Sequence, residues 1–178
     1  MTRIVGSVGT DHHPYERMLD WLTAAKTALD LDVFVQRGAT PDRGTIDTVD
    51  YTSADELAEL MQAADVVVCH GGPGTISLAI RCGHRPIVMA RDPARGEHVD
   101  DHQMRYVARL AAEGVIDSVT TLDQLIELLR AGRQRITASD DSAAEQAVER
   151  FGELVGELLG GTLPKRTLRQ RIVLRREG

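Results

Sequence analysis

The stretch ADVVVCHGGPGTISLAIRCGHRP, which runs from Ala64 to Pro86, decides the fold of this 178-residue chain. It begins with an apolar run, Val66–Val68, that is too short for a helix and is typical of a strand buried on both faces. A glycine-rich corner follows, and Thr75 is expected to begin a helix. The stretch therefore predicts a strand, a tight turn and a helix of an open α/β sheet.

The glycine-rich corner has the composition of an anion-binding turn. Gly71, Gly72 and Gly74 carry no side chains, so main-chain N–H groups can approach a ligand closely. The helix expected from Thr75 adds free N–H groups and the positive end of its dipole. We interpret the corner as a phosphate site, with a plain tight turn as the alternative.

The rest of the chain alternates short apolar runs with amphipathic segments. This alternation predicts an open, Rossmann-like parallel sheet of about six strands, covered by helices on both faces. Besides the run at 66–68, the expected strands are 3–8, 32–36, 48–52, 86–90 and 115–119. Helices are expected from near Pro14, after the capping residues Ser53, Thr121 and Ser142, and on both sides of residues 86–90.

Two helices have buried faces that can be assigned from spacing. The first is expected to pack on the sheet through Tyr15, Met18, Leu19 and Leu22. The helix that follows the polar segment 91–103 is expected to bury Met104, Val107, Ala108 and Ala111.

Two further groups of polar or small residues follow predicted strands. Gly9 and Thr10 follow the first strand, and Asp101, His102 and Gln103 lie where segment 91–103 enters its helix. The carboxyl ends of parallel strands line one crevice, so these groups are expected near the glycine-rich corner. A plain turn at Gly9 is the alternative for the first group.

Segment 91–103 also contains residues that can bind metals. His98 and His102 are four residues apart, and Glu97 and Asp101 lie beside them. A solvated charged loop explains the same pattern, and we expect no metal site and no cofactor.

Composition limits the classes of partner. The net charge of −6 and the aromatic content of 3% argue against a nucleic-acid partner. Residues 165–178 are nevertheless strongly basic. Cys69 and Cys82 form no metal-type pair and are typical of buried thiols in a reducing compartment. No signal peptide or membrane span is visible, so we expect a cytoplasmic protein.

Taken together, SVGT near the start, CHGGPGTISLAIRCG in the middle and GEHVDDHQ after the next strand resemble one known family. The chain is similar, over about residues 1–130, to the carboxyl-terminal, donor-binding half of family 28 glycosyltransferases, which have the GT-B fold. It is more closely similar to the small subunits of split glycosyltransferases, such as those of exopolysaccharide synthesis and of dolichol-linked N-acetylglucosamine transfer.

The resemblance implies a site for a nucleotide-sugar, with UDP as the expected nucleotide. It implies that the diphosphate binds at Gly9, Thr10, Gly71, Gly72, Gly74 and Thr75. It implies that the donor sugar lies near His70, Asp101, His102 and Gln103. It assigns no catalytic residue. One position departs from the family, because Leu78 stands where many members carry a glutamate that binds the ribose.

The resemblance also implies a partner. A complete GT-B enzyme has a second domain that holds the acceptor, so we expect a membrane-anchored acceptor-binding subunit and a lipid-linked or polysaccharide acceptor. We expect one domain at 1–163, ending in an amphipathic helix, and a basic tail at 164–178. The helix could contact the partner or simply cover the sheet, and the tail could contact the partner or an anionic membrane, or be solvated.

Two other functions fit parts of the sequence. The GGPGT run also resembles the corner of phosphoribohydrolases that act on nucleoside monophosphates, but residues 76–83 hold no acid to serve as the catalytic glutamate. The second alternative is a non-catalytic nucleotide-binding module.

Overall fold

The computed structural model of the chain describes residues 1–132, 149–153 and 156. Within these residues, six strands form one sheet in the order β3-β2-β1-β4-β5-β6, and every neighbouring pair is parallel. The predicted α/β class is confirmed. The strands are β1 (Arg3–Ser7), β2 (Asp32–Gln36), β3 (Asp47–Val49), β4 (Val66–His70), β5 (Ile87–Met89) and β6 (Asp117–Ser118).

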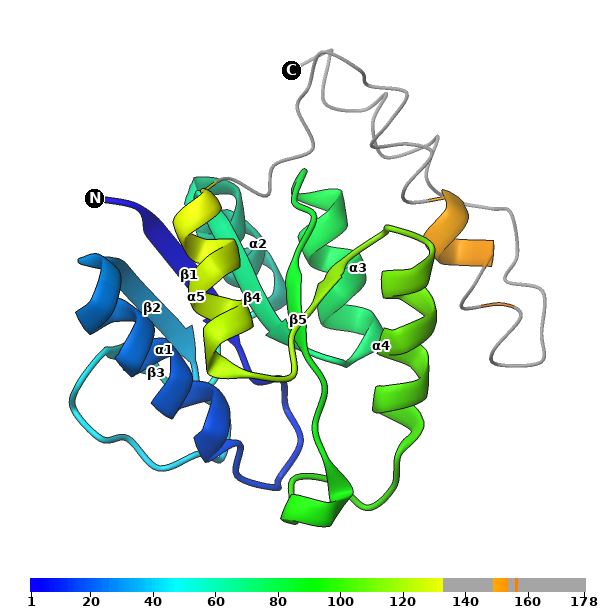
Figure 1. Cartoon of the computed structure of the whole chain (residues 1–178), viewed down its shortest axis with the longest axis horizontal. Coiled ribbons are helices and arrows are strands. Elements are labelled where there is room, and N and C mark those ends of the chain that lie inside the picture. Colours follow the sequence, from blue (N-terminus) through cyan, green and yellow to red (C-terminus); the bar gives the residue numbers. More distant parts are fainter. Residues whose placement is uncertain (133–148, 154–155, 157–178) are drawn as a thin grey trace.

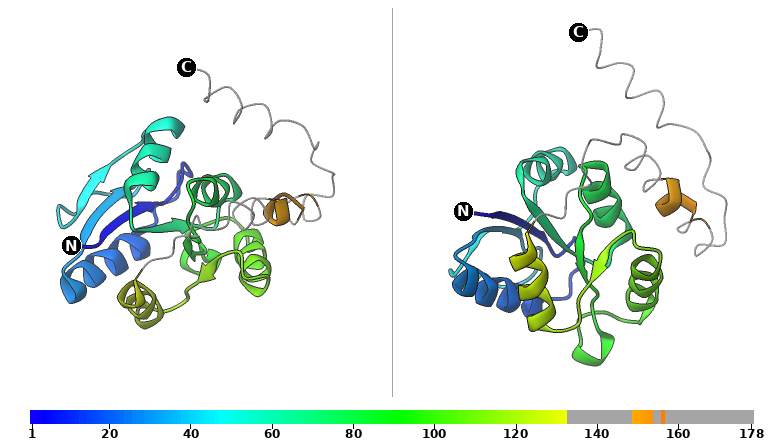
Figure 2. Two further views of the ribbon diagram at one scale, coloured as in Figure 1. Left: turned by 90° about the horizontal axis from the view of Figure 1, so that it is seen from above. Right: turned by 45° about the horizontal axis from the view of Figure 1, so that its top comes forward.

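Helices cover both faces of the sheet (Figures 1 and 2). One face packs against α1 and α5, and the other packs against α2, α3 and α4. The helices are α1 (Glu16–Leu29), α2 (Ala54–Ala63), α3 (Pro73–Arg81), α4 (His102–Ala112) and α5 (Leu122–Ala131), with a short 3-10 helix η1 (Pro93–Arg95) between β5 and α4.

Strand β4 is the centre of this arrangement and is buried along its whole length. Val66 and Val68 face the layer of α1 and α5, whereas Val67 and Cys69 face the opposite layer. This alternation explains why the run is uniformly apolar, because a central parallel strand needs apolar side chains on both faces. The predicted buried face of α1 is confirmed, since the side chains assigned to it are buried: Tyr15, Met18, Leu19 and Leu22.

The strand register sets which residues meet at the carboxyl edge of the sheet. Ser7 of β1 pairs with Cys69 of β4, and His70 pairs with Met89 of β5. The turn after β1, the corner after β4 and the segment after β5 therefore leave the sheet side by side, at the edge where η1 lies (Figure 1).

Two details of the predicted helices were wrong. Helix α3 begins at Pro73 rather than Thr75, with Gly72 as its N-cap, because proline suits the first helical position. Helix α4 buries Tyr106, Val107 and Leu110, whereas Met104 and Ala108 are exposed. The helix is rotated so that Tyr106 and Leu110, rather than Met104 and Ala108, pack against the sheet.

The final helix is described only in part. Residues 149–153 are helical, and the ring of Phe151 packs edge-on against Tyr106 of α4 with 6.4 Å between centroids. At Phe151, therefore, the helix packs on the domain itself, which is the alternative in which the helix covers the sheet. The remainder of that predicted helix and the basic tail lie outside the described residues. None of the described helices is long and apolar enough to cross a membrane.

Candidate functional site

The imidazole of His70 lies between two glycines at the carboxyl edge of the sheet. A Cβ atom at position 9 would lie 2.5 Å from His70 Nε2, and one at position 72 would lie 2.1 Å from the same atom. Gly9 also has a φ of +80°, which favours glycine. The ring therefore occupies the space that side chains at both positions would fill, and the turn after β1 meets the corner after β4 through His70.

Burial keeps His70 in its neutral form. Loss of hydration lowers the pKa of His70 to about 4, and the positive charge of Arg91 acts in the same direction. The Nδ1 atom is buried and has no hydrogen-bond partner within the described structure. At neutral pH the ring can therefore offer a hydrogen bond to a ligand but not a charge.

The turn that carries Gly9 is fixed by polar side chains of the two strands beneath it. Ser7 Oγ donates to Gln36 Oε1 at 2.7 Å, and the Gly9 N–H approaches Ser7 Oγ at 3.3 Å. Gln36 Nε2 donates to the Gly9 carbonyl at 3.4 Å. These contacts hold the turn in place beside His70.

Arg91, which follows β5, is a functional candidate that the sequence reasoning missed. Its side chain is completely buried. Nη1 donates to the carbonyls of His13 at 2.8 Å and Glu97 at 3.0 Å, and Nη2 donates to the carbonyl of Val8 at 2.9 Å. The guanidinium also lies over the Tyr15 ring, 4.7 Å from its centroid. The buried guanidinium of Arg91 thus joins the turn after β1 to the segment after β5. The position of Arg91 directly after a predicted strand was the feature of the sequence that could have identified it.

Glu97 has a structural role rather than a metal-binding one. Its carboxylate forms a two-point ion pair with Arg17, with both N–O distances 2.8 Å, and Oε2 also accepts from the Asp92 N–H at 2.8 Å. His102 instead bonds Asp100 at 2.8 Å. The set Glu97, His98, Asp101 and His102, weighed above as a metal site, does not form a ligand cluster among the described residues.

Gln103 is the residue of the DHQ motif that reaches the glycine-rich corner. A Cβ atom at Gly71 would lie 3.2 Å from both Cβ and Oε1 of Gln103, so the side chain of Gln103 occupies the space that a side chain at position 71 would need. Gln103 Oε1 is buried without a hydrogen-bond partner in the described structure. Because a buried carbonyl oxygen without a donor is costly, Gln103 is a candidate to accept a hydrogen bond from a ligand.

The other predicted site residues lie at the surface around this centre. Thr10, Gly74, Asp101 and His102 are exposed, and Thr75 is partly exposed. No atom lies within 4 Å of a Cβ at Gly74, so the first turn of α3 faces open space. Asp101 pairs with Arg105 at 3.0 Å and points along α4. The structure therefore brings His70, Gly71 and Gln103 together, and leaves Asp101 and His102 at the rim.

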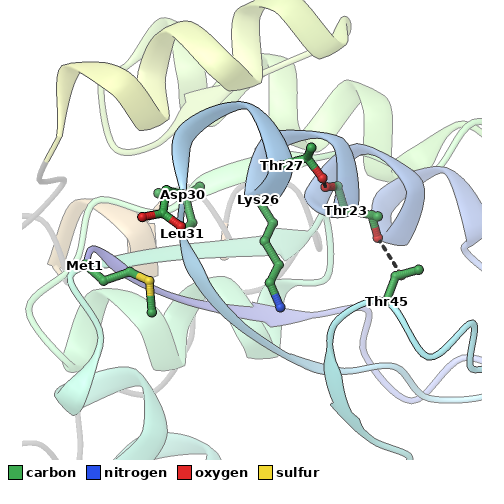
Figure 3. Close-up of a pocket in the computed structure, with 7 residues that line it drawn as sticks. All are labelled: Met1, Thr23, Lys26, Thr27, Asp30, Leu31 and Thr45. Carbon is green, nitrogen blue, oxygen red and sulfur yellow. Dashed lines mark hydrogen bonds between the residues drawn. The ribbon is translucent and has the colours of Figure 1, made fainter.

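A separate hollow lies at the opposite edge of the sheet (Figure 3). It has a volume of about 550 Å3 and lies beside the amino ends of β1 and β2, lined by Met1, Thr23, Lys26, Thr27, Asp30, Leu31 and Thr45. It shares no residue with the carboxyl-edge site.

The sequence of residues 23–158 matches the glycosyltransferase family 28 C-terminal domain. This match covers well over half of the chain. The chain belongs to this glycosyltransferase family. No curated protein sequence matches the chain.

Solved structures of glycosyltransferases share the fold of this family 28 domain. The glycotransferase of kitacinnamycin matches with a TM-score of 0.59 and 16% identity, over 99% of this chain and 43% of that one. MurG of Acinetobacter baumannii matches with a TM-score of 0.58 and 17% identity, over 99% of this chain and 52% of that one. The chain thus spans about half the length of these structures, and at such identities the likeness concerns the fold alone.

The structure of ALG13 also aligns, with 16% identity over 83% of this chain and 94% of that one. The TM-score of this alignment is 0.49. Within the family 28 domain, Leu78 packs against the apolar cluster that α2 and α3 share, so its side chain contributes to the core.

Proposed function

We propose that this family 28 domain binds the nucleotide-sugar donor, with UDP as the nucleotide, for a glycosyltransferase that acts on a lipid-linked or polysaccharide acceptor. The observation that carries the proposal is that two distant motifs lie side by side: the side chain of Gln103 of α4 fills the space next to Gly71, the residue that follows His70 in the corner. The family assignment favours this function over a phosphoribohydrolase or a non-catalytic module.

The diphosphate is proposed to bind at the start of α3. Gly72 is the N-cap and uses no side chain, so the first N–H groups of the helix are left for a ligand. Gly74 faces open space and leaves room for a phosphate. Thr75 and Thr10 could add hydroxyl donors, and neutral His70 could add one hydrogen bond. These groups would stabilise the negative charge that grows on a departing nucleoside diphosphate.

The donor sugar is proposed to lie toward α4. An amide side chain such as that of Gln103 can both donate to and accept from sugar hydroxyls. Asp101 and His102, at the rim, could contact the outer part of the sugar. No residue of this chain is assigned as the general base, and no cofactor is proposed for the transfer.

Transfer is proposed to require a second part that holds the acceptor. The chain spans about half the length of the glycosyltransferase structures that it matches. We propose that a membrane-anchored subunit supplies the acceptor site, that the two meet in the cytoplasm, and that residues beyond the described part, including the basic tail, contact that subunit or an anionic leaflet.

Calorimetric titration of the purified chain tests the donor part. UDP and UDP-sugars should bind, and GDP-mannose should bind at least tenfold more weakly. Gly74→Val should abolish binding by filling the open space at the start of α3, whereas Ser77→Val, which places the same side chain one turn further along the helix, should not. Equal affinity of wild type and Gly74→Val would contradict the proposed phosphate site.

Transfer of radiolabelled sugar from UDP-sugars to a lipid extract tests the partner part separately. The chain alone should be inactive, and adding membranes that contain the acceptor subunit should restore transfer. Efficient transfer by the chain alone would contradict the proposal of a partner while leaving the donor site intact.

A further inference from the structure

Three histidines surround the carboxylate of Asp11 in the turn between β1 and α1. Asp11 Oδ1 lies 2.6 Å from His13 Nδ1 and 3.9 Å from His12 Nδ1. The other oxygen, Oδ2, lies 3.8 Å from Nε2 of His98, which comes from the segment after β5. One potential ligand atom from each of Asp11, His12 and His13 lies within 4.8 Å of the others. We refer to Asp11, His12, His13 and His98 as the Asp11 cluster.

The spacing within the Asp11 cluster is close to that of a metal site. Ligands bound at about 2.0–2.1 Å in a tetrahedron are separated from one another by roughly 3.3 Å. The distance from Asp11 to His13 is shorter than this, and the distances to His12 and His98 are longer. Each of these three distances from Asp11 differs from roughly 3.3 Å by less than 1 Å. All four side chains are partly or fully exposed, so they can move and an ion can reach them.

Neighbouring hydrogen-bonding groups orient Asp11 and His98 as potential ligands. Asp11 Oδ1 accepts a hydrogen bond from the main-chain N–H of His13 at 2.7 Å, which fixes the carboxylate beside the ring of that residue. Nδ1 of His98 faces the N–H of Asp100 at 3.4 Å and its carboxylate at 3.5 Å, which turns Nε2 of His98 toward Asp11.

The chemistry of the donors selects the ion. Imidazole nitrogens favour zinc, nickel or copper over magnesium and calcium, which prefer oxygen ligands. The positive charge of Arg91 weakens the attraction of any cation that relies on charge alone, so the histidine nitrogens must supply the selectivity. A transition-metal ion therefore fits better than magnesium.

We propose that the Asp11 cluster binds one divalent transition-metal ion, of which Zn²⁺ is the representative, through Asp11, His12 and His13, with His98, beside the other carboxylate oxygen, as a further ligand. This assignment departs from the expectation of no metal that the sequence alone supported. The ion would add positive charge beside the Gly9 turn. Its binding is a property of the chain by itself and does not depend on the proposed donor site.

Zinc affinity measured by competition with a chromophoric chelator tests the proposal. The full chain without a purification tag should bind one equivalent of Zn²⁺. Asp11→Asn and His13→Gln should each weaken binding at least tenfold. His102→Gln is the matched control, because its ring is largely exposed and bonds Asp100 instead, and it should bind as wild type does. Failure of wild type to bind, or equal affinity of all variants, would overturn the proposal.

A spectroscopic measurement distinguishes a formed site from loose surface binding. Co²⁺ added to the wild-type chain should give the intense visible absorption of a four-coordinate ion, and excess Zn²⁺ should remove it. Asp11→Asn should lose the band while keeping the wild-type circular dichroism spectrum in the absence of metal. A band that survives in both Asp11→Asn and His13→Gln would show that the ion binds elsewhere.

Discussion

His70 Nε2 lies where the side chain of residue 72 would have to be, since a Cβ atom at that position would be 2.1 Å away. Gly72 is therefore glycine because of the histidine two residues before it, and the same ring also explains Gly9. Part of the glycine-rich corner serves to accommodate an imidazole at the carboxyl edge. Gly74, whose Cβ position is open, is the glycine whose absent side chain leaves space for a ligand.

Gly72→Ala should destabilise the domain, because the new methyl group forces the His70 ring out of its place. We expect the free energy of unfolding to fall by about 1–3 kcal/mol, as for other overpacked sites. Gly74→Ala should have the opposite sign and raise it by about 0.4–1 kcal/mol, because the helix accepts alanine there and the unfolded chain loses freedom. Urea denaturation of both variants measures the two effects.

A double variant isolates the cause. His70→Ala removes the ring, so His70→Ala combined with Gly72→Ala should be destabilised by less than the sum of the two single changes. Strict additivity of the two free-energy changes would mean that the ring is not what excludes a side chain at position 72.

The low pKa of His70 predicts a pH dependence of stability. In the folded state its pKa is lowered to about 4 from an ordinary value of 6.5. Between these values the unfolded chain binds a proton that the folded chain does not, so the free energy of unfolding falls as the pH falls from 6.5 toward 4. The loss attributable to His70 is about 3 kcal/mol over this range.

Unfolding curves of wild type and His70→Gln across pH 4–8 test this prediction. Other groups also titrate, Asp11 and Glu56 among them, and they contribute equally to both proteins. The difference between the curves should therefore shrink as the pH falls below 6.5. A constant difference over the whole range would show that His70 does not titrate abnormally.

Arg91 is expected to be the most sensitive polar position of the carboxyl edge. Arg91→Met keeps the aliphatic part of the side chain but leaves three carbonyls without their donors, so the free energy of unfolding should fall by about 3 kcal/mol or more. Arg91→Lys should cause an intermediate loss, because an ammonium group cannot reproduce the planar fork.

The control for Arg91 is Arg105→Ala, which removes an exposed arginine from α4 and should change stability by about 0.5 kcal/mol or less. Limited proteolysis supplies a second measurement. In Arg91→Met, cleavage should increase in segments 9–15 and 91–98, which the guanidinium joins. Unchanged cleavage there would argue that other contacts hold the two segments.

The sequence predicted the layers of this fold better than the contacts of its site. Strand β4 and its glycine-rich corner were recognised because burial on both faces demands a continuous apolar run. The start of α3 was misplaced because Pro73 was taken as part of the turn. Arg91 was missed because it bonds main-chain carbonyls, which every residue type carries, so the sequence does not indicate its partners. His70 was predicted as a site residue, but its packing against Gly9 was not, because the spacing of the two residues in the sequence does not predict that contact.

Gln103 offers the sharpest separation of function from stability. Its Oε1 is buried without a partner in the described structure, so the domain gains little from that amide. Gln103→Met keeps the length and the packing on Gly71 while removing the polar group, and the free energy of unfolding should stay equal or rise slightly.

If Gln103 binds the donor sugar as proposed, the same change should weaken UDP-sugar binding about tenfold or more, corresponding to the loss of roughly one to two hydrogen bonds. Binding of UDP alone should be unchanged, because the sugar is absent. Calorimetry with both ligands measures the two affinities, and an equal loss for UDP and UDP-sugar would place Gln103 at the phosphates instead.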